Sequence, residues 1–324
     1  MPSSISTRLR GAGALAASAA VVFPLAGCIP DHEPPARHIA DTVVAPAPGA
    51  MGVQPGVETV PEVVQSPSQA GPSEVRPPST VPARPVPATG EALESIGHAL
   101  PELTGIAIAP VGRAEEVAVF GDLQTGVAWS TSKVPLAIAA LRVNPGAATQ
   151  VRAAITQSDN EAAEALWEGL GGGESAASAV TGVLREARDV TTTVPATRLR
   201  EGFTVFGQTQ WDAANQATFA ANLPCLPDSA AVLAEMGSIV PEQRWGLGRI
   251  DGARFKGGWG PADTHAGYLA RQFGILPTPS GDVAVAVIAD APDLGSAEKK
   301  LDAIAQTLTD QLGNLPGGTC PPAA

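Results

Sequence analysis

Lysine is scarce in this chain of 324 residues, which has four lysines, a net charge of −12 and a hydrophobic fraction of 44%. Arginine supplies most of the positive charge, and arginine keeps its proton in a protein, whereas a desolvated lysine can lose it. Two lysines lie in short motifs with serine and glycine, Ser130-Thr131-Ser132-Lys133 and Lys256-Gly257-Gly258. A lysine three residues after a serine, in a chain that otherwise avoids lysine, is a candidate base.

Histidine and cysteine are also rare, and their scarcity disfavours several kinds of active site. The four histidines occur without a Gly-x-Ser-x-Gly elbow, so a Ser-His-Asp triad lacks its usual sequence context. The three cysteines and the histidines show no zinc-site spacing, and we expect neither a metal nor a cofactor. The net charge of −12 argues against nucleic acid as a partner. We expect a monomer.

Residues 1–27 have the composition of an export signal. Arg8 and Arg10 precede a small, apolar run over residues 11–27, which is too short for a comfortable membrane span. The residues before Cys28 resemble the lipobox of bacterial lipoproteins, whose cysteine is lipidated, for example with palmitate. That resemblance implies an extracytoplasmic protein anchored to the membrane through Cys28. The alternative is an ordinary signal peptide in which Cys28 has no role.

Residues 28–90 are predicted to form a disordered tether. The segment holds about half of the chain's 31 prolines and shows no apolar periodicity. Such a stretch cannot bury enough apolar surface to offset its ordering entropy. A coil of about 60 residues has an end-to-end distance of roughly 45 Å. We therefore expect the tether to hold the following domain away from the membrane, within reach of cell-wall material.

Residues 91–324 are predicted to form one α+β domain. Apolar patterns and turn residues indicate a first helix, two strands, a block of helices, three strands and a last helix. The expected strands cover 105–110, 116–121, 253–258, 267–276 and 282–289, and the expected helices cover 91–100, 131–142, 148–156, 161–169, 175–187, 209–223, 229–236 and 296–312. Strands at both ends predict one antiparallel sheet of about five strands beside a mostly helical subdomain.

Cys225 and Cys320 are the two cysteines that remain once Cys28 is set aside. An even pair in an exported protein predicts a disulfide, because such bonds persist outside the cytoplasm. Closing a loop of this length would contribute about 4–5 kcal/mol in the chain-entropy account. The alternative is two free, buried thiols.

Three motifs that carry chemistry follow one another along the domain. Ser130 precedes an apolar helical run, so its hydroxyl is expected near the positive end of a helix dipole. Lys133 lies one turn later on the same face, with its amine in reach of that hydroxyl. Ser158-Asp159-Asn160 comes between the two lysine motifs. An ordinary lysine amine is a poor base at neutral pH, so burial or a second cation, for which Lys256 is the candidate, must lower the pKa of Lys133.

The ordered set of Ser-x-x-Lys, Ser-Asp-Asn and Lys-x-Gly resembles the signature of class A β-lactamases and penicillin-binding proteins. Residues 91–315 look like a serine hydrolase domain of that superfamily, which includes the D,D-peptidases. The resemblance implies an acyl-enzyme formed with a β-lactam or a peptidoglycan-derived peptide. In it, Ser130 is the nucleophile, Lys133 accepts its proton, and Ser158 relays a proton to the leaving nitrogen.

The same resemblance implies a set of substrate-binding residues. Asn160 would hold Lys133 and the substrate amide, and Lys256 would attract the substrate carboxylate. Gly258 and Trp259 belong to the substrate-binding strand. The backbone N–H groups of Ser130 and Trp259 would form the oxyanion hole.

Departures from the family pattern concern the carboxylate site and deacylation. In the family a threonine or serine at the position of Gly257 helps to hold the substrate carboxylate through its hydroxyl. Arg271 on the next strand is a candidate to hold the carboxylate instead; the alternative is a plain surface arginine. Residues 189–207 lack the Glu-x-x-x-Asn pattern of the Ω-loop, and Glu201 is assigned to a solvated ion-pair cluster. The segment between Ser130 and Ser158 is shorter than in the family, so the helical wall of the cleft must be trimmed.

Three further glutamates, Glu161, Glu164 and Glu168, form a helical face after the Ser-Asp-Asn motif and are assigned to solvent.

The groups needed for acylation are present in the sequence, whereas no base for deacylation is visible. We expect slow turnover. A non-catalytic cell-envelope binding lipoprotein on the same fold is the alternative, and a surface adhesin with coincidental motifs is a third interpretation.

Overall fold

The structure, a computed structural model, describes residues 88–262 and 267–322. All of the described residues belong to one compact unit, which covers residues 78–324. The predictions for the export signal, Cys28 and the tether up to residue 87 lie outside the described residues. Within the described ranges, no helix is both long and apolar enough to cross a membrane.

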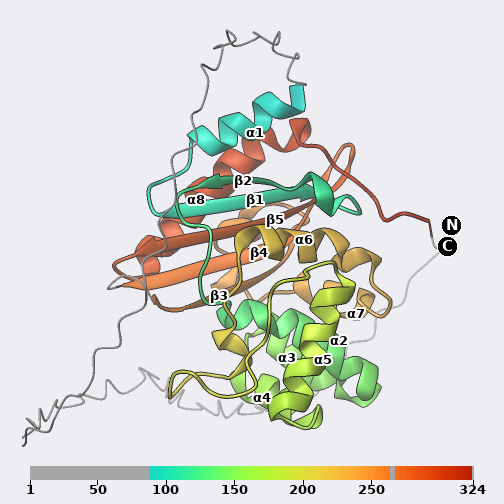
Figure 1. Cartoon of the computed structure of the whole chain (residues 1–324). Coiled ribbons are helices and arrows are strands. Elements are labelled where there is room, and N and C mark those ends of the chain that lie inside the picture. The colour runs from blue at the N-terminus through green and yellow to red at the C-terminus, as the bar shows by residue number, and fades with distance from the viewer. Residues whose placement is uncertain (1–87, 263–266, 323–324) are drawn as a thin grey trace, which may run out of the picture. The chain divides into compact units, whose positions relative to one another are not determined.

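Five antiparallel strands form a single sheet with the order β2-β1-β5-β4-β3 (Figure 1). The strands are β1 (Thr104–Pro110), β2 (Ala118–Gly121), β3 (Arg254–Pro261), β4 (Tyr268–Thr278) and β5 (Gly281–Ala291). Because the first strand pairs with the last, both ends of the domain build the sheet, which confirms the predicted architecture. The strand of the Lys-Gly-Gly motif, β3, lies at one edge and, among the described strands, pairs only with β4.

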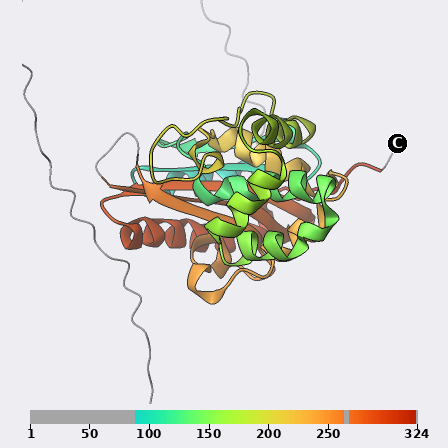
Figure 2. The same cartoon turned by 90° about the horizontal axis from the view of Figure 1, so that it is seen from below.

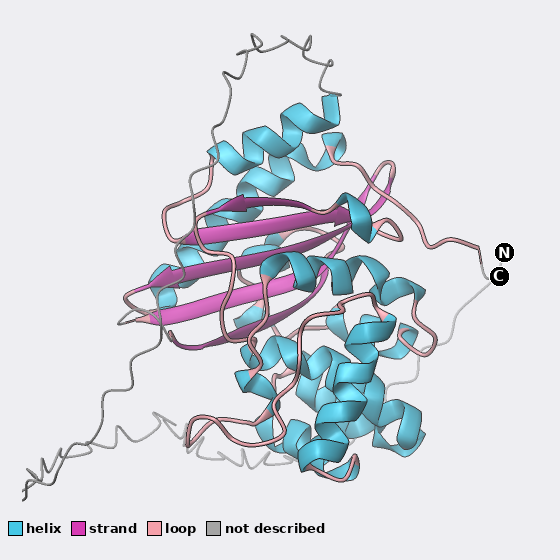
Figure 3. Cartoon of the chain, in the orientation of Figure 1, coloured by secondary structure: helices cyan, strands magenta, loops and turns pink. Residues whose placement is uncertain are grey.

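Helices cover both faces of the sheet and extend beyond its β3 edge. They are α1 (Ala88–His98), α2 (Lys133–Val143), α3 (Ala148–Thr156), α4 (Asn160–Gly169), α5 (Gly173–Glu186), α6 (Ala213–Asn222), α7 (Ala230–Met236) and α8 (Leu294–Gln311). The helix α8 packs on one face, with α1 against it, and α6 packs on the opposite face (Figure 2). Figure 3 shows α2 to α5 gathered with α7 as the helical subdomain.

The apolar pattern of β5 explains this three-layer arrangement. Residues 283–289 are apolar without interruption and all are buried. A strand that alternates apolar and polar residues can face water on one side, whereas a continuous apolar run requires cover on both faces. The buried stripe of α8, which includes Leu301, Ile304 and Leu308, covers one face of the sheet, and α6 covers the other.

A 3₁₀ turn and a side-chain cap set two helix boundaries that periodicity placed differently. The predicted helix over 131–142 begins at Lys133, after a 3₁₀ turn at Trp129–Ser132. The helix expected from 209 begins at Ala213, because the side chain of Asp212 accepts the Ala214 N–H at 2.8 Å and so fixes the first turn.

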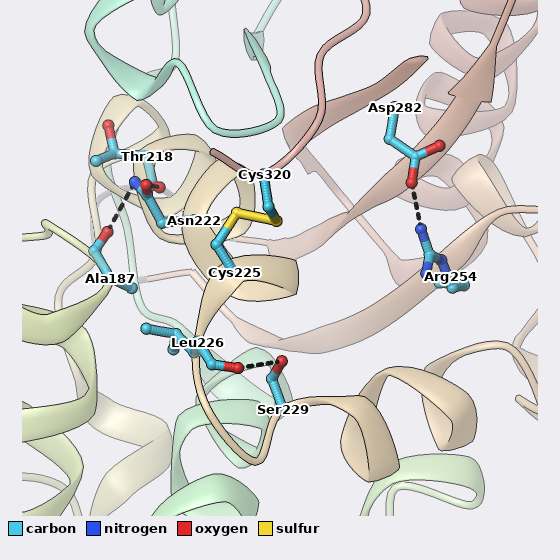
Figure 4. Close-up of a disulfide and its surroundings, with 9 residues drawn as sticks. All are labelled: Ala187, Thr218, Asn222, Cys225, Leu226, Ser229, Arg254, Asp282 and Cys320. Atoms are coloured by element: carbon cyan, nitrogen blue, oxygen red, sulfur yellow. Dashed lines mark hydrogen bonds and ion pairs between the residues drawn. A yellow bond between two sulfur atoms is a disulfide. The ribbon is translucent and has the colours of Figure 1, made fainter. Parts of the chain in front are cut away.

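A disulfide joins Cys225 to Cys320 across a sequence separation of 95, which confirms the predicted pairing. Cys225 ends the short turn Leu223–Cys225 that follows α6, and Cys320 lies in the C-terminal tail (Figure 4). The bond therefore ties the end of the chain to the region between the sheet and the helical subdomain.

Candidate active site

The 3₁₀ turn Trp129–Ser132 presents a single free hydroxyl. Thr131 Oγ1 donates to Ala128 O at 2.5 Å, and Ser132 Oγ donates to Trp129 O at 2.7 Å. These bonds stabilise the turn and use the hydroxyls of two of its residues. Ser130 Oγ has no such bond among the described residues, and Ser130 lines a cavity.

Lys133 begins α2 and is fully buried, with its amine directed at the Ser-Asp-Asn segment. Its Nζ donates to Ser158 O at 2.5 Å and to Asn160 Oδ1 at 2.7 Å, and lies 3.5 Å from Ser158 Oγ. In the described part of the chain, no hydrogen bond joins Lys133 Nζ to Ser130 Oγ. Catalytic hydrogen bonds are often long in ligand-free sites and tighten only when substrate is bound.

Burial lowers the pKa of Lys133 from 10.5 to about 7, while the charges of Asp159 and Glu164 act in the opposite direction. Of the two causes that the sequence left open, burial is therefore the main one. A neutral amine is thus accessible near neutral pH, as a proton acceptor requires.

Lys256 is the second buried amine of the site. Its Nζ donates to Ser158 Oγ at 3.0 Å and to Gly257 O at 2.8 Å. Burial lowers the pKa of Lys256 well below 10.5, and the positive charge of Lys133 lowers it further. Both amines therefore approach the same hydroxyl, that of Ser158.

The segment Ser158–Asn160 combines a structural and a chemical feature. Asp159 Oδ1 accepts the Ala162 N–H at 2.8 Å and caps α4, so the motif is indeed a helix start. Ser158 has a φ of 59°, a left-handed conformation that is uncommon for serine. In this conformation both its carbonyl oxygen and its hydroxyl approach Lys133. Such local strain is typical of functional sites.

Strand β3 approaches the Ser130 turn so closely that only glycine fits at two positions. A Cβ on Gly258 would lie 2.7 Å from Ser130 N, and a Cβ on Gly260 would lie 2.5 Å from the Trp129 ring. A Cβ on Gly257 would instead meet Trp245 at 3.4 Å, an ordinary contact on the other face of the strand. The sequence Lys-Gly-Gly therefore brings the strand backbone against the N–H of Ser130.

The outer edge of β3 directs backbone groups toward the turn. Gly257 O accepts from Lys256 Nζ, and Pro261 O accepts from Arg200 Nη1 at 3.4 Å, so these alternate residues point away from β4. Trp259 lies between them and shares their orientation, because strand residues alternate in hydrogen-bonding direction. Its N–H therefore points to the outer edge of β3, the strand that lies against the Ser130 turn, where the predicted oxyanion-hole donor is expected.

A cavity of about 670 Å³ opens in front of Ser130. It is lined by Trp129, Ser130, Asn160, Glu161, Glu164, Arg198, Gly202, Phe203, Thr204, Trp259, Gly260, Pro261 and Tyr268. Ser130, Asn160 and Trp259 of the predicted site reach this lining. Lys133, Ser158 and Lys256 lie behind it, joined to one another by the hydrogen bonds described above.

Lys256 and Arg271 differ from their predicted roles as carboxylate-binding groups. Lys256 is fully buried and does not line the cavity. Arg271 is also fully buried, and its guanidinium donates to Gly126 O at 2.8 Å, to Trp211 O at 2.9 Å and to Gln216 Oε1 at 2.7 Å. The Arg271 prediction is therefore wrong, because the side chain satisfies buried carbonyls instead of facing a substrate.

The predicted solvated glutamate stripe divides between the cavity and the surface. Glu161 and Glu164 line the cavity, whereas Glu168 is exposed outside it. Glu161 is exposed, as predicted, whereas Glu164 is half-buried in the cavity wall, so the assignment of Glu164 to solvent is wrong. Glu164 follows Asn160 by four residues, so the helical period was the signal that could have placed it on the face of α4 that carries Asn160. Glu201 is exposed and does not line the cavity.

No protein-family model and no curated protein matches the chain. Solved structures do match its fold. TLA-3 extended-spectrum β-lactamase has a TM-score of 0.55 at 17% identity, covering 69% of this chain and 99% of that one. A β-lactamase from Desulfarculus baarsii has a TM-score of 0.52 at 19% identity, covering 70% and 97%.

A variant of the last common ancestor of Gram-negative bacterial class A β-lactamases also matches, with a TM-score of 0.52 at 18% identity, covering 68% of this chain and 97% of that one. At such identities the likeness concerns the fold alone. The chain has the α+β fold of β-lactamases, with its three predicted motifs meeting beside one cavity.

Proposed function

We propose that this protein is a membrane-anchored, extracytoplasmic serine hydrolase of the β-lactamase and D,D-peptidase type. It forms an acyl-enzyme on Ser130 with β-lactams or peptidoglycan-like peptides and deacylates slowly. The proposal rests chiefly on one observation. A buried lysine whose pKa is lowered to about 7 follows a cavity-lining serine and is joined by hydrogen bonds to Ser158 and Asn160.

Acylation would use the groups around the turn in a fixed order. Ser130 Oγ attacks the carbonyl carbon of the β-lactam or peptide, and its proton passes to the neutral amine of Lys133. The N–H groups of Ser130 and Trp259 stabilise the oxyanion of the tetrahedral intermediate. The carbon–nitrogen bond then breaks, and the leaving nitrogen takes a proton from Ser158 Oγ.

Ser158 can be reprotonated from its two lysine neighbours. Lys256 Nζ lies 3.0 Å from Ser158 Oγ, and Lys133 Nζ lies 3.5 Å from it. The proton that Lys133 takes from Ser130 can therefore reach the leaving group through one hydroxyl. This short relay supports Ser158 as the proton donor of the acylation step.

A fluorescent penicillin tests the proposal directly. The purified chain is expected to acquire a covalent label that the Ser130→Ala variant lacks, with intact mass increased by the mass of one ring-opened penicillin. A panel of β-lactams then separates a persistent adduct from rapid hydrolysis. Equal labelling of wild type and Ser130→Ala, or no labelling of either, would contradict the proposal.

The second candidate is a non-catalytic binding lipoprotein of the cell envelope. It is favoured by the full burial of Lys256 and by the absence, within the described residues, of a hydrogen bond between Lys133 and Ser130. In that case a Ser130→Ala, Lys133→Ala double variant retains binding to peptidoglycan fragments and retains biological function, while neither protein is labelled by penicillin.

Membrane anchoring through Cys28 is a separate part of the proposal. It is supported by the lipobox-like sequence before Cys28 and by the proline-rich stretch after it. Metabolic labelling with an alkyne fatty acid is expected to mark the wild-type chain in the membrane fraction. A Cys28→Ala variant should lose both the label and the membrane association. Unlabelled wild-type protein would refute this part alone.

A further inference from the structure

Glu164 places a carboxylate in the wall of the same cavity as Ser130. It lies on α4 one helical turn after Asn160 and is half-buried. Its charge raises the pKa of Lys133, so it lies near enough to act on the buried amine. Within the described residues its carboxylate has no hydrogen bond and no ion pair, whereas most of the buried polar groups around it are paired with protein atoms.

Asn160 offers a complementary group beside it. Asn160 Oδ1 accepts from Lys133 Nζ at 2.7 Å, which fixes the orientation of the side-chain amide. Asn160 Nδ2 is then left to donate toward the cavity, and no partner for it occurs in the described part of the chain. A donor amide and an acceptor carboxylate on successive turns of one helix can hold and polarise a water molecule.

We propose that Glu164 is the general base that activates water to release the acyl group from Ser130, with Asn160 orienting that water. This inference rests on the proposed acyl-enzyme function and supplies the deacylation base that residues 189–207 lack. Its position differs from that of an Ω-loop glutamate, since it lies on the helix that begins with the Ser-Asp-Asn motif.

The step balances without any further reactant. The water oxygen bonds to the ester carbonyl carbon, and one water proton passes to the Glu164 carboxylate. The tetrahedral intermediate then collapses, the bond between the carbonyl carbon and Ser130 Oγ breaks, and Oγ recovers a proton from the carboxyl group of Glu164. The products are the free serine, the Glu164 carboxylate and a carboxylic acid.

The other two glutamates of the stripe provide matched controls. Glu161 lines the cavity but is not among the charges that act on Lys133, and Glu168 is exposed outside the cavity. Glu161→Gln therefore tests a general loss of negative charge in the cavity. Glu168→Gln tests the effect of the same substitution on the helix itself.

The experiment follows the penicilloyl adduct by intact mass spectrometry after excess fluorescent penicillin is removed. Glu164→Gln is expected to reach the same final extent of acylation as the wild type, whereas the half-life of its adduct should increase at least about tenfold, in line with loss of a general base. The two control variants should release the adduct at the wild-type rate. The acylation profile of Glu164→Gln should also shift to lower pH, because a charge that favours protonated Lys133 is removed.

Several outcomes would overturn the assignment of Glu164. An unchanged half-life in Glu164→Gln, an equal increase in Glu161→Gln, or a wild-type adduct that never decays would each do so, while leaving acylation of Ser130 intact. Absence of a Ser130-dependent adduct in the wild type would refute the proposed function itself, and the role of Glu164 with it. Melting temperatures of all three variants identify any change that comes from folding.

Discussion

Adding one methyl group at Gly258 should disable acylation, whereas the same change at the neighbouring Gly257 should be tolerated. A Cβ on Gly258 would lie 2.7 Å from Ser130 N, 2.9 Å from Ala128 O and 2.9 Å from Thr131 N. All three atoms belong to the backbone, so no side-chain rotation can relieve the contacts. The strand and the turn must then move apart.

The required displacement is large on the scale of hydrogen-bond geometry. Ordinary contacts between carbon and nitrogen or oxygen are near 3.4 Å, so the turn must move by roughly 0.5 Å or more. Such a movement disturbs the two N–H groups assigned to the oxyanion hole. Losing one donor of this kind costs about 10²–10³ in rate, or about 3–4 kcal/mol in the transition state. Overpacking should also lower the free energy of unfolding by about 1–3 kcal/mol.

Gly257→Ala provides the control on the same strand. The atoms nearest to its Cβ would be side-chain atoms, of Trp245 at 3.4 Å and of Gln272 at 3.7 Å. The assay is the rate constant of labelling by fluorescent penicillin, measured for both variants under conditions where circular dichroism shows a folded protein. Wild-type labelling by Gly258→Ala would refute the argument that the β3 backbone and the Ser130 turn form the oxyanion site. If the labelling rate constant fell equally in both variants, the cause would be any substitution on β3 and not the contact between residue 258 and the Ser130 turn.

Three further predictions concern pH and stability. Because Lys133 must be neutral to accept a proton and its pKa is about 7, the acylation rate constant should rise about tenfold per pH unit below pH 7 and level off above it; a flat profile from pH 5 to 9 would exclude Lys133 as the base. The pKa of Lys133 is lower in the folded chain, so between pH 7 and 10.5 the unfolded chain binds more protons and stability should rise with pH. Urea titrations should therefore show the wild type gaining on the order of a few kcal/mol over Lys133→Met across this window, and parallel curves would contradict it. Reducing the bond between Cys225 and Cys320, 95 residues apart, should lower the free energy of unfolding by about 4–5 kcal/mol, and an unchanged urea midpoint in dithiothreitol would show that the bond adds no stability.

The local sequence predicted the order and type of the main elements because each carries its own signal. The helix over 148–156 agrees with α3 at both ends, and the strand predicted over 282–289 lies within β5. Boundaries shifted where a side chain caps the first turn, as Asp212 does before α6. The motif residues were also visible, because a nucleophile and its proton acceptor can be recognised from residue type and spacing.

Burial and facing direction were decided by tertiary packing alone. From the sequence, Arg271 could be a surface arginine. In the structure its position on β4 buries the guanidinium, which donates to the carbonyls of Gly126 and Trp211, two residues that are distant along the chain. From the sequence, Glu164 was assigned to solvent. In the structure its position on α4 places it in the wall of the cavity, which residues of β3 and of the Ser130 turn also line. The pKa of Lys133 likewise depends on burial, which arises from parts of the chain that no local pattern connects.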